Sequence, residues 1–195
     1  MAEIKIKKKQ PIWPWLLLLA GILAGLYYFF VYDENDAIVD KKELVTEDTT
    51  VMPTVADEKV AEYNQFIADN SEMDLDHEFS NNALLKLIAA TEAVANSVNV
   101  DINADLDTAR ADADYITKDP MDGNHANKIK SAGEIIVQAL TKVQTQKFEN
   151  LSTELSDVKS SVNKIQNETL TLEQKAAVKD FFKRAGELLT NMNQQ

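Results

Sequence analysis

The sequence predicts an all-α protein: an N-terminal transmembrane helix followed by an antiparallel helical bundle with one long coiled-coil-like helix. Three observations favour this fold class. Residues 12–32 are apolar and uncharged. Residues 54–119 contain no glycine or proline, and residues 124–185 contain only Gly133. Apolar residues recur every three or four positions through both of these ranges, which is typical of amphipathic helices.

The apolar stretch 12–32, IWPWLLLLAGILAGLYYFFVY, is expected to cross a lipid bilayer once. As a helix it would span about 30 Å, which matches the hydrocarbon core. Aromatic residues suited to the membrane–water interface lie at its two ends: Trp13, Trp15, Tyr27, Tyr28 and Tyr32. The alternative is a cleaved signal peptide. The bulky Tyr-Tyr-Phe-Phe-Val block, with no small-residue cleavage site after it, favours a retained signal anchor.

The charges on either side of this stretch predict its orientation. Residues 1–11 form a basic tail with four lysines, whereas acidic residues follow the stretch directly. Positive residues stay on the cytoplasmic side, so we expect a single-pass protein of the cell inner membrane. Its N-terminus would be cytoplasmic and its C-terminal domain periplasmic. Gly21 and Gly25 form a GxxxG pair, which permits either homo-oligomerisation through this helix or ordinary close packing.

Composition excludes some partners. The chain has 20 basic and 32 acidic residues and a net charge of −12. A surface of this sign repels phosphate backbones, so we expect no nucleic acid partner. The chain has no cysteine. In an oxidising compartment its stability must therefore come from an apolar core.

Residues 33–53 are predicted to be an acidic linker, and residues 54–195 a periplasmic bundle of five helices. Thr54 and Asp57 are spaced as a capping pair at the start of the first helix. Short polar connections separate helices predicted at about 54–69, 79–98, 101–118, 124–166 and 171–192. Amphipathic helices joined in this way fold as an antiparallel up-and-down bundle.

The fourth predicted helix is the longest and carries two apolar stripes. The second stripe consists of Phe148, Leu151, Leu155, Val158, Val162 and Ile165. A step of five residues from Val143 to Phe148 separates the stripes, which indicates a change of supercoil or a break. We expect the second stripe either to pair with the last helix or to serve as a coiled-coil surface for a protein partner or a second copy.

Two histidines lie at the starts of helices that an alternating bundle brings to the same end. His77 precedes the second helix and His125 begins the fourth, and Asp76 and Asp122 come from connections at that end. Two imidazoles with carboxylates are a ligand set for Zn or another divalent ion. The alternative is that these residues cap helices.

Motifs for catalysis are missing from the sequence. It has no phosphate-binding glycine loop, no HExxH and no cysteine-based metal site. We therefore expect no enzyme activity and no cofactor.

Three stretches resemble those in uncharacterised single-pass envelope proteins of Bacteroidota-type bacteria: MDLDHEFSNNALLKLIAATEAVA, KDPMDGNHANKIKSAGEII and LTLEQKAAVKDFFKRAGELL. The resemblance implies an N-terminal anchor and a helical exterior domain, and it supplies no catalytic residues. The sequence thus favours a non-enzymatic, membrane-anchored interaction or scaffold protein of the bacterial envelope. The alternative is an extracytoplasmic ligand- or metal-sensing bundle that acts through a separate partner.

Overall fold

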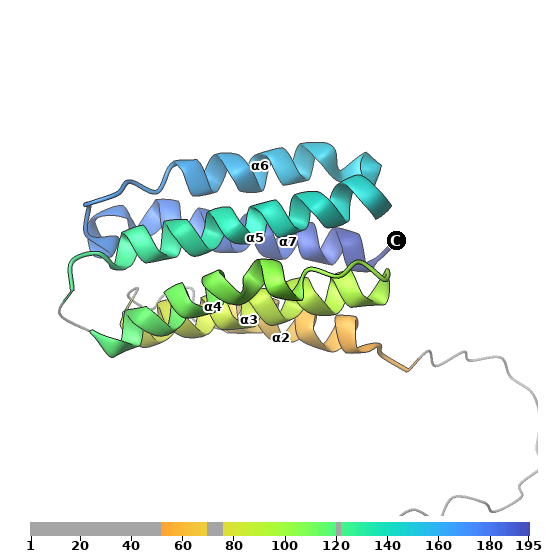
Figure 1. The fold of residues 1–195 in the computed structure, drawn as a ribbon, viewed down its shortest axis with the longest axis horizontal. Coiled ribbons are helices and arrows are strands. Elements are labelled where there is room, and N and C mark those ends of the chain that lie inside the picture. The colour runs from red at the N-terminus through yellow and green to blue at the C-terminus, as the bar shows by residue number, and fades with distance from the viewer. Residues whose placement is uncertain (1–51, 70–75, 120–121) are drawn as a thin grey trace, which may run out of the picture. The chain divides into compact units, whose positions relative to one another are not determined.

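The computed structural model describes residues 52–69, 76–119 and 122–195 (Figure 1). In these ranges all regular secondary structure is helical and there is no strand, which confirms the predicted all-α class. The α-helices described are α2 Val55–Asp69, α3 His77–Ser97, α4 Asn103–Lys118, α5 His125–Lys147, α6 Ser152–Asn163 and α7 Lys175–Asn193. Two 3₁₀ turns, Glu149–Leu151 and Thr171–Gln174, precede α6 and α7.

The predicted membrane helix 12–32 and residues 33–51 of the predicted linker lie outside the described residues, so the membrane anchor and its aromatic residues stay predictions. Among the helices that the structure describes, none has the length and apolar character needed to span a bilayer.

Successive helices run antiparallel, as predicted, in two groups of three (Figure 1). Helices α2, α3 and α4 lie side by side, and α5, α6 and α7 pack above them in this view. The chain enters α2 at the end of the bundle where the C-terminus also lies. The α4–α5 and α6–α7 connections lie at the opposite end, which we call the distal end.

Helix α7 joins the two groups because its two adjacent phenylalanines face different halves of the core. Phe181 lies against α5, where its ring would be 3.1 Å from a Cβ at Gly133. Phe182 contacts the ring of Phe79 on α3, with centroids 6.2 Å apart. The fully buried Tyr63 of α2 donates a hydrogen bond to the Phe182 carbonyl oxygen at 2.7 Å.

The prediction of one long helix over 124–166 is wrong, because the chain leaves the helix at Phe148. Phe148 has φ −136° and ψ 51°, and α6 begins four residues later at Ser152. The Gln144 amide closes the turn by donating to the carbonyl oxygens of Phe148 and Glu149 at 3.0 and 3.2 Å. The five-residue step thus marks a break. It reverses the chain so that both apolar stripes face one core.

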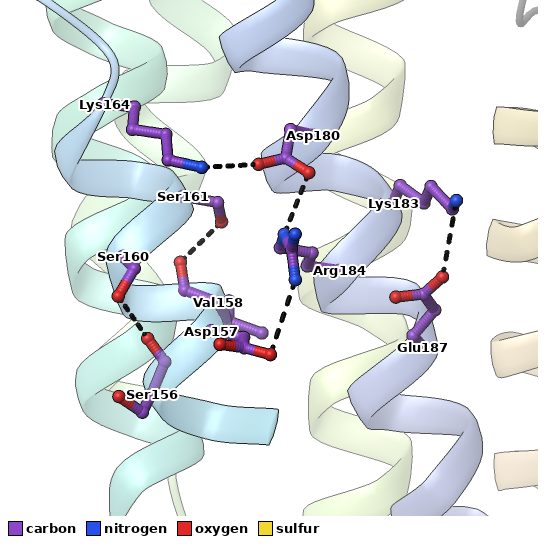
Figure 2. Close-up of polar contacts among 10 residues, drawn as sticks. All are labelled: Ser156, Asp157, Val158, Ser160, Ser161, Lys164, Asp180, Lys183, Arg184 and Glu187. Carbon is purple, nitrogen blue, oxygen red and sulfur yellow. Dashed lines mark hydrogen bonds and ion pairs between the residues drawn. The ribbon is translucent and has the colours of Figure 1, made fainter. Parts of the chain in front are cut away.

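Ion pairs on the outside hold α6 against α7 (Figure 2). Asp180 accepts from Lys164 at 3.3 Å and from Arg184 at 2.9 Å, and Arg184 also pairs with Asp157 at 3.5 Å. Beneath them the second stripe is buried, with no member more than 8% exposed: Phe148, Leu151, Leu155, Val158, Val162 and Ile165. The interpretation of this stripe as a partner surface is therefore wrong in this fold. Its side chains pack inside the bundle.

The predicted capping pair of Thr54 and Asp57 is confirmed. Thr54 N–H donates to Asp57 Oδ2 at 2.7 Å, and Asp57 N–H donates to Thr54 Oγ1 at 3.1 Å. Hydrogen bonds that the Thr54 N–H and hydroxyl donate to the Asp57 carboxylate lower its pKa. Thr171 and Gln174, in contrast, form no capping pair. The Gln174 side chain instead reaches back to the backbone of Gln166, accepting from its N–H at 2.7 Å.

Glu62 predicts a pH dependence of stability. Hydrogen bonds from Lys86 of α3 and Lys59 of α2 lower the pKa of its carboxyl from 4.5 to about 2. A lowered folded-state pKa stabilises the fold above the unfolded-state value, and this contribution is lost as pH falls from about 4.5 through about 2. Because Glu62 and both of its lysine partners are partly exposed, we expect their contribution to the free energy of unfolding to be less than about 1 kcal/mol.

Urea unfolding at pH 5 and pH 2.5 measures this effect. Glu62→Gln should flatten the decrease in stability between these two pH values, whereas Glu58→Gln, an exposed acid of the same helix, should not. Equal pH dependence of wild type and Glu62→Gln would contradict the assignment.

Candidate functional site

The two histidines meet at the distal end, as the alternating topology predicts. His77 begins α3 and His125 begins α5, and their ring centroids lie 4.4 Å apart with the planes at 86°. His125 is only 8% exposed, and its Nε2 lies 2.8 Å from the Asp119 carbonyl oxygen. Because a carbonyl oxygen only accepts, Nε2 carries the hydrogen and donates it. The structure therefore fixes the orientation of this ring.

The two aspartates predicted beside the histidines are engaged in local hydrogen bonds. Asp76 is the N-cap of α3, with Oδ1 accepting from Phe79 N–H at 2.6 Å. Asp122 accepts from the Tyr115 hydroxyl at 2.8 Å and from Asn124 N–H at 3.0 Å. The bond from Tyr115 lowers the pKa of Asp122 and raises the pKa of Tyr115. Asp76 thus acts as the capping alternative describes, whereas Asp122 stabilises the turn before α5 and caps no helix.

The predicted metal site does not form in this arrangement. In the ranges covered by the structure, no group of three or more histidine, aspartate or glutamate side chains is placed to hold a metal ion. The His125 Nε2 is engaged with a carbonyl oxygen, and the two rings pack edge to face. A structural zinc site needs about four converging ligands. His77, His125, Asp76 and Asp122 do not supply them here.

An ion pair between a buried carboxylate and a partly exposed lysine lies deeper in the same end and was not predicted. Asp112 of α4 is 6% exposed, and its Oδ1 accepts from Lys128 of α5 at 2.7 Å. The Lys128 ammonium also lies 5.0 Å from the centre of the Tyr115 ring. Asn81 of α3 donates to the Ala113 carbonyl oxygen at 2.8 Å. These contacts join the ends of α3, α4 and α5. Removing Lys128 would be costly, since it leaves the buried Asp112 carboxylate uncompensated.

The distal end also presents apolar side chains. The large hydrophobic residues exposed in the structure, within the part of the chain that it describes, are Met52, Val55, Tyr115, Leu170 and Leu172. Met52 and Val55 lie where the chain enters the bundle. The other three belong to the last turn of α4 and to the α6–α7 connection, at the distal end. Exposed large apolar residues therefore gather at the two ends of the bundle.

A groove with a volume of about 420 Å³ lies between the end of α2, the start of α3 and the outer face of α7. Its apolar lining includes Ile67, Phe79 and Phe182, and two lysines of α7, Lys179 and Lys183, also line it. The helical spacing of the α7 aromatics favours a core position over the alternative that they line a ligand groove. Phe182 is buried at 1% exposure and still contributes to the groove.

The fold and these surfaces define an antiparallel helical bundle with a polar, histidine-containing end and an adjacent apolar groove. Comparisons of the chain with protein-family models, with curated proteins and with solved structures found no match. The resemblance to single-pass envelope proteins stays a prediction.

Proposed function

We propose that the chain is a non-enzymatic, membrane-tethered interaction protein of the bacterial envelope that binds a protein partner through its distal end. The observation that carries this proposal is the exposure of Leu170 and Leu172, at 52% and 57%, in the α6–α7 connection. Leucines this exposed are costly to keep in water, and exposed apolar side chains that gather in one place are typical of protein-binding sites.

The connection that carries these leucines is held in place by hydrogen bonds. The Gln174 side chain donates to the carbonyl oxygens of Gln166 and Thr169, each at 2.9 Å. Glu168 N–H donates to the Asn127 side chain of α5 at 2.8 Å. A binding loop that is already ordered loses little conformational entropy when a partner binds. The two leucines are therefore presented in a form suited to recognition.

The topology supports the same end as the partner surface. Helix α2, which follows the predicted linker in sequence, begins at the end of the bundle opposite to the α6–α7 connection that carries Leu170 and Leu172. The acidic character of the chain favours a partner with basic residues around an apolar contact, because complementary charge speeds association.

Chemical cross-linking in intact cells tests whether partner binding depends on Leu170 and Leu172. The full-length chain and the Leu170→Ser/Leu172→Ser double variant are cross-linked, solubilised and purified. We expect a stoichiometric envelope protein with the wild type and its loss with the double variant. Val55→Ser, which removes an exposed apolar residue at the opposite end, should retain it. An unchanged set of cross-linked proteins in the double variant would refute the proposal.

A further inference from the structure

The groove between α2, α3 and α7 has the volume of a small-molecule site, and its apolar wall is held in place by packed aromatic rings. Its volume of about 420 Å³ lies within the range of about 300–1,000 Å³ that such sites occupy. The Phe79 ring at its base is held from two sides, by Phe66 at 5.4 Å and by Phe182 at 6.2 Å between ring centroids. The apolar wall is therefore formed before any ligand binds.

The polar groups of the groove are of two kinds. The Asn64 amide donates to the Thr190 hydroxyl at 2.8 Å, so these two side chains already satisfy each other. Lys179 and Lys183 are one helical turn apart on α7, and both line the groove. Lys183 pairs with Glu187 at 3.7 Å, with both side chains more than half exposed. An exposed ion pair of this kind contributes little to stability. An incoming anion can therefore replace the Glu187 carboxylate as the partner of Lys183 at a small cost in free energy.

This combination specifies the ligand chemistry. An apolar wall favours a hydrocarbon, and two adjacent ammonium groups favour an anion even though the whole chain has a net charge of −12. We propose that the groove binds one fatty acid molecule, with its chain on Ile67, Phe79 and Phe182 and its carboxylate paired with Lys179 and Lys183. This proposal does not depend on the protein-binding function of the distal end.

A photoreactive fatty acid tests the proposal on the full-length chain in lipid nanodiscs. After irradiation, labelled peptides are identified by mass spectrometry. We expect labelling of the peptides that contain Ile67 or Phe182. Lys179→Glu/Lys183→Glu should reduce it by about tenfold or more, because the charge-assisted pairing is replaced by repulsion. Lys159→Glu, an exposed charge reversal on α6, should leave it unchanged.

Competition experiments and the position of the label distinguish a bound fatty acid from other possible occupants of the groove. An unlabelled fatty acid should compete, whereas its methyl ester and a single-chain phospholipid should not. Equal competition by these neutral or phosphate-bearing compounds would refute recognition of the carboxylate. Labelling confined to residues 12–32 would mean that the probe only partitions into the bilayer. If the groove is labelled only in the Met73→Ser/Leu75→Ser variant, residues 70–75 of the chain itself compete with the probe for the groove, and the proposal fails.

Discussion

The Val158→Asp variant is expected not to fold. Val158 is fully buried on α6, within the stripe that packs between α5 and α7. A carboxylate placed there has no partner, and burying an unpaired charge costs several kcal/mol or forces the group to take up a proton. Because a domain is stable by only about 5–15 kcal/mol, this one substitution removes much or all of its stability. Circular dichroism during heating should show no cooperative unfolding transition, or one at a much lower temperature.

Ser156→Asp is the matched control, since it places the same side chain at an exposed position of the same helix. It should change the free energy of unfolding by no more than about 0.5 kcal/mol. A Val158→Asp variant that melts like the wild type would mean that α6 does not return to the bundle. The stripe would then be a free surface, as one of the two sequence-based interpretations has it.

The positions of most helices could be predicted because they depend on local pattern. The three-four period of apolar residues and the scarcity of glycine and proline identify α2, α3, α4 and α7 to within a few residues. The direction of α6 could not be predicted in the same way. A continuous helix with a changed supercoil and a reversal at Phe148 are both consistent with the five-residue step, and the choice depends on groups far apart in sequence. Arg184 of α7, which pairs with Asp157 of α6, is one of them.

The candidate sites also include features that could be predicted from the sequence and features that could not. The meeting of His77 and His125 follows from helix alternation alone, and the structure confirms it. In sequence, an aspartate before a helix can be a capping residue or a metal ligand, and the observed hydrogen bond from Phe79 N–H to Asp76 decides for capping. The full lining of the groove could not be predicted, because its walls come from both ends of the bundle sequence. The Asn64–Thr190 hydrogen bond, for example, joins residues 126 positions apart.

Phe181→Ala is expected to destabilise the bundle by about 3–5 kcal/mol, the range for removing a buried aromatic side chain. Phe181 is fully buried where α5, α6 and α7 converge, since a Cβ at Gly133 would lie 3.1 Å from both the Phe181 ring and the Val162 side chain. Gly133→Leu should overpack the same place and cost about 1–3 kcal/mol, partly offset by the better helix propensity of leucine.

These two changes should compensate each other when combined. The leucine at position 133 fills part of the cavity left by Phe181→Ala, so the double variant should be more stable than the sum of the single effects predicts, by about 1 kcal/mol or more. Combining Gly133→Leu with Val60→Ala is the matched control. Val60 is buried on α2, which packs on α3 and α7, so those effects should add within about 0.5 kcal/mol. Urea unfolding of the set measures both couplings. Additivity in the Phe181 pair would contradict the contact through which α7 joins the returning α5–α6 hairpin to the rest of the bundle.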